Sequence, residues 1–88
     1  MNMYETAIID AIVEITAAPD AGRFDTATRF EADLGFDSGS FIELFLILEE
    51  TIPGFSLGTA RLEQKDFDTV ALLATFIERR MNELEAVA

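Results

Sequence analysis

The chain lacks both cysteine and histidine, and it contains only six lysine and arginine residues. Without cysteine there can be no disulfides, thiolate metal sites or cysteine nucleophiles. Without histidine there can be no Ser-His-Asp triad, no histidine-ligated zinc and no general base of the commonest kind. Most classes of enzyme are thereby disfavoured.

The scarce basic residues are outnumbered by seventeen Asp and Glu residues, which gives a formal net charge of −11. Residues 31–60 contain no Lys or Arg, although several carboxylates lie there: Glu31, Asp33, Asp37, Glu43, Glu49 and Glu50. Nucleic acid and anionic membranes would repel such a chain, so neither is expected as a partner. A protein with a basic surface would be attracted to it.

Long apolar runs are also missing, since the run at residues 44–48 is far shorter than a membrane span. The acidic start of the chain has no basic segment of the kind that opens a signal peptide. These absences favour a cytoplasmic protein. Half of the 88 residues are apolar and eight are Phe, so we expect one domain, 1–88, with a single core, and a monomer.

Apolar residues recur at spacings of three and four in three segments, and each segment predicts an amphipathic helix. We expect these helices over about residues 3–17, from 37–38 to 50–51, and from 68–69 onwards. Pro19 and Gly22 should stop the first helix. A short helical turn is expected at residues 62–67. Because no strand alternation or repeat occurs, the expected fold is a small all-α bundle of three main helices and one short helix.

The stretch between the first two helices, residues 18–37, is long for a loop in a compact domain. Its apolar side chains Phe24, Phe30 and Leu34 can pack onto the helices, so we expect this loop to be ordered. The second helix has more apolar surface than one core contact requires. Four of its residues form the stripe expected to face the core: Phe41, Leu44, Phe45 and Leu48. Three others lie off that stripe: Ile42, Leu46 and Ile47.

Carboxylates near the second helix do not form a recognisable catalytic or metal-binding motif. Glu49 and Glu50 are adjacent, so they point apart on a helix. Asp33 and Asp37 are four residues apart, but the EF-hand pattern counted from Asp33 fails at its third, sixth and twelfth positions. A phosphate-binding loop with the G-x-x-x-x-G-K-[ST] pattern is absent as well.

Ser38 has two interpretations. A serine at a helix start is ordinarily only an N-cap. A phosphate ester on Ser38 would instead lie where backbone N–H groups and the positive end of the helix dipole favour an anion. Phe36 and Phe41 could hold the turn rigid and shelter whatever the phosphate carries. A serine hydroxyl without a nearby base is a weak nucleophile, so another enzyme would have to modify it.

The segment at residues 33–50, DLGFDSGSFIELFLILEE, resembles the acyl carrier protein family. That family shows D-x-G-x-D-S-L followed by an acidic helix with E-L and L-E-E at these offsets. The length, the acidity, the long first loop and the segment FDTVALLATFI at residues 67–77 are similar to the same family. The resemblance covers nearly the whole chain and implies a four-helix acyl-carrier-like bundle.

This resemblance implies that Ser38 carries 4′-phosphopantetheine, donated by coenzyme A through a separate phosphopantetheinyl transferase. Asp37 precedes the modified serine as the family pattern has it. The thiol of the arm would hold an acyl, aminoacyl or peptidyl group as a thioester. The reactive sulfur would then belong to the prosthetic group, which accounts for a protein without cysteine.

The resemblance also implies a docking surface on the second helix for acyltransferase, ligase or synthase enzymes with basic patches. Glu43, Glu49 and Glu50 would supply the charge, and Ile42 and Leu46 would supply exposed apolar contacts. Ordinary helix surface is the alternative interpretation of each of these residues.

One position departs from the family pattern, because Gly39 stands where the family usually has Leu directly after the serine. That Leu commonly contacts partner enzymes, so Gly39 implies altered partner choice. It favours a dedicated carrier in a specialised polyketide, nonribosomal or hybrid pathway over one that serves general fatty-acid enzymes.

Other interpretations stay open at this stage. The chain could be a peptidyl or aminoacyl carrier, because these share the serine, although the acidity and Asp37 favour the acyl type. It could be an unmodified acidic helical adaptor that binds basic proteins. It could also be a divalent-cation-binding domain that uses the carboxylates at residues 31–37.

Overall fold

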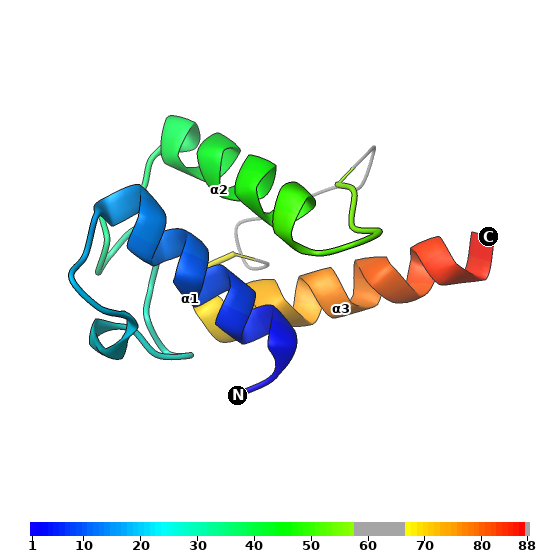
Figure 1. Ribbon diagram of the computed structural model, residues 1–88, viewed down its shortest axis with the longest axis horizontal. Coiled ribbons are helices and arrows are strands. Elements are labelled where there is room, and N and C mark those ends of the chain that lie inside the picture. Colours follow the sequence, from blue (N-terminus) through cyan, green and yellow to red (C-terminus); the bar gives the residue numbers. More distant parts are fainter. Residues whose placement is uncertain (58–66, 88) are drawn as a thin grey trace.

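The computed structural model describes residues 1–57 and 67–87, and over these residues the chain is a small, compact, all-helical protein without strands. Three α-helices are present: α1 (Met3–Thr16), α2 (Ser38–Thr51) and α3 (Val70–Val87). A short 3-10 turn, η1 (Ala21–Arg23), lies in the loop after α1. In Figure 1, α1 packs against both other helices, whereas the backbones of α2 and α3 do not approach each other closely.

Helix α1 begins as its sequence dictates, with a capping box. The Asn2 side chain accepts a hydrogen bond from the Glu5 N–H, and the Glu5 carboxylate accepts one from the Asn2 N–H, both at 2.8 Å. The helix ends before the expected Pro19 and Gly22, because Ala17 adopts the left-handed conformation with φ 54°. Its buried face consists of Ile8, Ile9, Ala11 and Ile12.

The core fills the space between the three helices and the two loops. From α2 it receives Leu44, Phe45, Leu48 and the following Ile52, and from α3 Val70, Leu73, Ala74, Phe76 and Ile77. The expected stripe of α2 is therefore confirmed except for Phe41, which is only partly buried. Ile47, expected off the stripe, is also partly buried against the core.

The long first loop is ordered by its apolar residues, as expected. Phe30 is fully buried, and Phe24 and Leu34 pack partly buried against the core. The same loop also supplies hydrogen-bond acceptors to the start of α3. The Val70 and Ala71 N–H groups donate to the carbonyls of Thr28 and Thr26 at 3.1 and 2.9 Å.

Side chains and backbone thus share the capping of α3. The Thr69 hydroxyl oxygen accepts from the Leu72 N–H at 3.2 Å, which confirms the expected cap. Together with the loop carbonyls, it satisfies the first N–H groups of α3, which have no partner within the helix. An isolated antiparallel bridge pairs Arg29 with Thr69 at the same point.

The described residues include only the last residue of the expected fourth helix. The short helical element that is seen is η1, in the first loop, which the sequence did not indicate. Residues 62–66 of the expected turn at 62–67 lie outside the described residues. Within the described residues, no helix combines the length and apolarity needed to cross a bilayer.

Candidate functional site

Ser38 is the first residue of α2, and Asp37 rather than Ser38 is the N-cap. The Asp37 carboxylate accepts hydrogen bonds from the Ser40 N–H at 3.0 Å and from the Ser40 hydroxyl at 3.2 Å. These bonds, the backbone one first, hold the pKa of Asp37 below its ordinary value. Because Asp37 performs the capping, the simplest structural reason for a serine at position 38 is removed.

The Ser38 side chain is exposed to solvent, and no side-chain hydrogen bond among the described residues involves it. Its hydroxyl lies at the positive end of the α2 dipole, where a phosphate is favoured. The Ser40 N–H, however, is already bonded to Asp37. A phosphate on Ser38 would therefore gain from the helix dipole but would have to share that particular donor with a carboxylate.

An open pocket of about 440 Å³ adjoins Ser38. Most of its wall is apolar, with carboxylates near the serine; the lining residues are Glu31, Asp37, Ser38, Phe41, Ile42, Phe45, Leu57 and Phe67. Volumes of a few hundred cubic ångströms with few polar groups are typical of sites for small organic groups. The lining residues fit a small apolar or amphipathic group.

Four phenylalanines form an aromatic cluster at this pocket. Phe41 lies at their centre, with ring centroids 5.6 Å from Phe30, 5.7 Å from Phe36 and 4.8 Å from Phe67. Such tilted and edge-to-face pairs are the arrangements that aromatic rings prefer. Phe30 and Phe36 are buried and do not line the pocket, whereas Phe41 and Phe67 form part of its wall.

The turn before α2 brings these rings together. Gly35 has φ 69°, a left-handed conformation that glycine adopts without steric cost. It allows the Phe36 N–H to donate back to the Phe30 carbonyl at 3.0 Å, and the two rings then lie 5.6 Å apart. The turn thus fixes both the position of Asp37 and the start of α2.

The proposed partner residues lie along α2 after Ser38. Ile42 and Leu46 are 63% and 57% exposed, so two large apolar side chains one turn apart face solvent. Glu43 and Glu50 are exposed on either side of Leu46 in the helical sequence. Gly39 is exposed next to Ser38, and a Cβ there would lie 3.4 Å from Asp37 Oδ1, an ordinary contact. The backbone therefore does not require glycine at this position.

Glu49 differs from the other acidic residues of α2, because it is partly buried and bonded within the chain. Its Oε2 atom accepts a hydrogen bond from the Leu57 N–H at 3.0 Å. Leu57 lines the pocket at Ser38. Glu49 therefore has a structural partner that its place on an acidic helix did not suggest.

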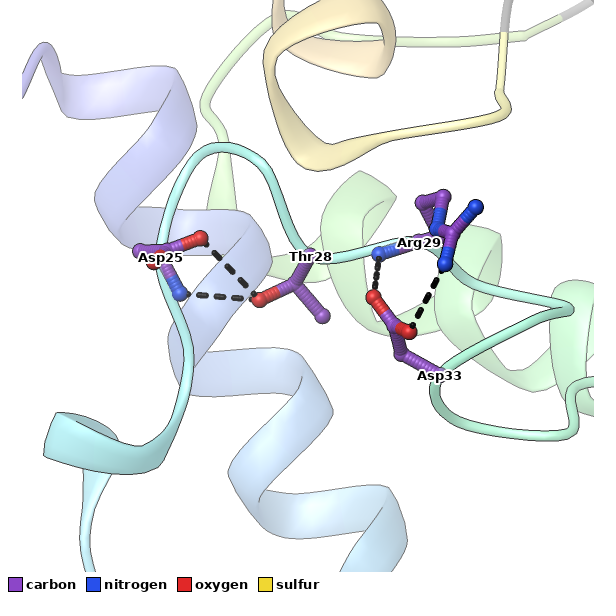
Figure 2. A network of polar contacts seen from close by, with 4 residues as sticks. All are labelled: Asp25, Thr28, Arg29 and Asp33. Carbon is purple, nitrogen blue, oxygen red and sulfur yellow. Dashed lines mark hydrogen bonds and ion pairs between the residues drawn. The ribbon is translucent and has the colours of Figure 1, made fainter.

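The carboxylates of the first loop stabilise the loop itself. Figure 2 shows Asp33 facing Arg29 and Thr28 facing Asp25. Asp33 accepts from the Arg29 N–H at 2.8 Å and pairs with its guanidinium at 3.5 Å; the backbone bond is the main cause of a lowered Asp33 pKa. No group of three acidic side chains that could hold a metal ion occurs in the described parts of the chain. These contacts give the cation-binding interpretation of residues 31–37 no support.

Several residues of the site carried no signal in the sequence. Leu57 and Phe67 line the pocket from beyond α2, and Ser40 binds the cap of the helix. Arg80 of α3 donates from Nε to the Ser56 carbonyl at 2.9 Å. Only the folded chain brings Leu57 and Phe67 to the pocket beside Ser38, because both residues lie beyond α2 in the sequence.

Comparison of the chain with known protein families, with curated proteins and with solved structures finds no match.

Proposed function

We propose that this chain is a free-standing, phosphopantetheine-dependent carrier protein that is modified at Ser38. The observation that supports the proposal best is the division of roles between neighbouring residues. Asp37 caps α2, while the Ser38 hydroxyl is exposed at the helix start beside an apolar pocket. A serine that only stabilised the helix would use its own oxygen as the cap.

The modification needs a separate transferase, because no side chain among the described residues is hydrogen-bonded to the Ser38 hydroxyl and so none is placed to remove its proton. The serine oxygen would form a new bond to the phosphorus that carries pantetheine in coenzyme A. The pyrophosphate bond would break, the nucleotide bisphosphate would leave, and the serine proton would pass to a base of the transferase. When bound, the arm supplies a thiol that holds cargo as a thioester.

The residues of the chain would then orient the arm and its cargo and present them to other enzymes. The helix dipole favours the phosphate, and the apolar wall of Phe41, Phe45 and Leu57 can accept the cargo. The exposed Ile42 and Leu46, with Glu43 and Glu50 beside them, match a partner surface that is apolar at its centre and basic at its rim. In this role the chain itself catalyses nothing.

The apolar pocket favours acyl cargo of a dedicated pathway, with a polyketide or hybrid polyketide and nonribosomal pathway as the proposed setting. An aminoacyl or peptidyl carrier is the nearest alternative. An adaptor that binds basic proteins without modification is the alternative from another class. It would use the same face of α2 but would leave an exposed serine beside the pocket without a purpose.

The test is intact-protein mass spectrometry after incubation with coenzyme A, magnesium and a broad-specificity phosphopantetheinyl transferase. We expect the wild type and Ser40→Ala to gain one phosphopantetheine and Ser38→Ala to gain none. Ser40→Ala is the matched control, because it removes the other serine of the same helical turn. A Gly39→Leu variant, run in parallel, has the residue usual in the family.

If neither the wild type nor Gly39→Leu is modified while both remain folded, the carrier proposal is overturned and the adaptor takes its place. Modification of Ser38→Ala at another residue would overturn the assignment of Ser38.

A further inference from the structure

A single peptide group in the loop after α2 is held at both ends by charged side chains. Glu49 of α2 accepts from the Leu57 N–H at 3.0 Å, and Arg80 of α3 donates to the Ser56 carbonyl at 2.9 Å. The Ser56 carbonyl and the Leu57 N–H belong to one planar peptide unit. The two side chains therefore hold the same rigid group from opposite sides, an arrangement that we call the peptide clamp.

The peptide clamp determines where one wall of the pocket lies. Leu57 is partly buried and lines the pocket that adjoins Ser38. A hydrogen bond to a charged group is stronger than one between neutral groups, so two of them on one peptide restrict its position. Because the backbones of α2 and α3 do not approach each other closely, the clamp is also a polar link between these helices.

Glu49 also stands close to the exposed apolar residues of α2. It follows Leu46 by three residues and Ile42 by seven, so it lies near the same face of the helix. A guanidinium group binds both oxygens of a carboxylate, whereas the Leu57 N–H is a single neutral donor. A basic side chain of a docked protein could therefore compete with Leu57 for the Glu49 carboxylate.

We infer that Glu49 is a positioning residue that couples docking on α2 to the pocket at Ser38. In the free protein it holds Leu57 against the pocket, and an arginine of a docked partner takes over the carboxylate and releases the Leu57 wall. This inference rests on the proposed function for its purpose, since release of the wall would let an attached group leave the pocket when a partner enzyme arrives.

Coupling of this kind is reciprocal, which provides a sharp test. If an arginine that binds Glu49 weakens the hydrogen bond between Glu49 and Leu57, then a change that weakens the same hydrogen bond must strengthen the binding of arginine to Glu49. Loss of the Arg80 hydrogen bond to Ser56 is such a change, because it loosens the same peptide unit. Arg80→Ala frees the Ser56 carbonyl without altering α2. Arg79→Ala is the matched control, because it removes the same charge from the neighbouring position, where the guanidinium lies over the Phe76 ring.

The experiment measures hydrogen exchange of the Leu57 amide by NMR in the unmodified protein, with and without a penta-arginine peptide. The Ile52 amide, bonded to the Leu48 carbonyl at 2.9 Å, serves as an internal reference. We expect saturating peptide to speed exchange of Leu57, but not of Ile52, by about tenfold in the wild type. In Glu49→Ala, the Leu57 amide should exchange without peptide as fast as it does in the wild type with peptide. Adding peptide to this variant should not change that rate.

Glu49→Gln keeps a carbonyl acceptor for Leu57 but has no charge for arginine to bind, so its Leu57 amide should stay protected with peptide present. Arg80→Ala should bind the peptide several-fold more tightly than Arg79→Ala. The inference is overturned if peptide leaves Leu57 exchange unchanged, if Glu49→Gln responds like the wild type, or if the two arginine variants bind equally.

These outcomes are independent of the modification of Ser38. A protein that gains phosphopantetheine but shows no peptide effect on Leu57 would keep the proposed function and lose the coupling. A protein that shows the coupling but gains no phosphopantetheine would be an adaptor whose docking opens a pocket.

Discussion

Glu49 and Arg80 hold opposite ends of the peptide unit between Ser56 and Leu57, although they belong to different helices. No ion pair joins them among the described residues, and the peptide lies between the two charges. This relationship gives an acidic residue of α2 a partner within the chain. Glu49 differs in this respect from Glu43 and Glu50, which are exposed on the same helix.

The capping of α2 by Asp37 leads to the first prediction. Asp37→Ala should lower the melting temperature by several degrees, because the Ser40 N–H and hydroxyl lose their acceptor. Ser38→Ala should change it by no more than about 2 °C, because the Ser38 side chain makes no such bond. Thermal unfolding followed by circular dichroism measures both. A larger loss in Ser38→Ala than in Asp37→Ala would mean that Ser38 is the effective cap.

Two glycines near Ser38 should respond to alanine in opposite directions. Gly35→Ala should reduce the free energy of unfolding by about 1 kcal/mol, because residue 35 has φ 69° and alanine is strained there. Gly39→Ala should raise the free energy of unfolding by up to about 1 kcal/mol, because residue 39 is helical and alanine favours a helix over glycine. The added Cβ would lie 3.4 Å from Asp37 Oδ1, which is an ordinary contact. Urea denaturation of the two variants beside the wild type gives the comparison. Equal changes in the free energy of unfolding of the two variants would show that the turn does not require a left-handed conformation at residue 35.

Acid should weaken the contribution of Asp37. Its pKa is lowered in the folded state, first by the Ser40 backbone N–H and then by the Ser40 hydroxyl. A lowered carboxyl pKa stabilises the fold above the ordinary value of 3.8, and the contribution is lost as the pH falls through the lower folded-state value. The stability difference between the wild type and Asp37→Asn should therefore be constant near neutrality and shrink below pH 3.8. A difference that grows in acid would contradict this sign.

The exposed apolar residues of α2 should matter for docking and not for folding. Replacing both Ile42 and Leu46 by Ser should leave the free energy of unfolding within about 0.5 kcal/mol of the wild type, because both side chains face solvent. Leu48→Ala, on the buried face, should cost about 2–5 kcal/mol. In the transferase assay, the Ile42 and Leu46 variant should lose kcat/KM mainly through a higher KM. An unchanged KM would remove these two residues from the docking surface.

The helices could be predicted because their signals are local. The apolar spacing located α1, α2 and α3 to within about a residue at their starts, and Thr69 was recognisable as a cap. The end of α1 was also predicted to within about a residue, although nothing in the sequence indicated that Ala17 adopts the left-handed conformation. The choice between Asp37 and Ser38 as the cap also stayed open, since both residue types serve equally well.

The exposed part of the candidate site was partly predictable as well. The surplus apolar residues Ile42 and Leu46 are indeed outside the core, as the stripe of α2 indicated. Phe41 was expected inside and is only partly buried, because it belongs to the aromatic cluster and also lines the pocket. The role of Glu49 in the peptide clamp could not be foreseen, because its partner is eight residues away across a change of chain direction.

The sequence by itself thus determined the charge, the absence of cysteine and histidine chemistry, the positions of the helices and the prominence of Ser38. These follow from composition and from periodicity, which each segment carries alone. The tertiary structure decided which residues surround Ser38, how Thr26 and Thr28 cap α3, and how Glu49 and Arg80 hold one peptide. Such contacts join segments far apart in the chain, and they form only when burial of the common core brings those segments together.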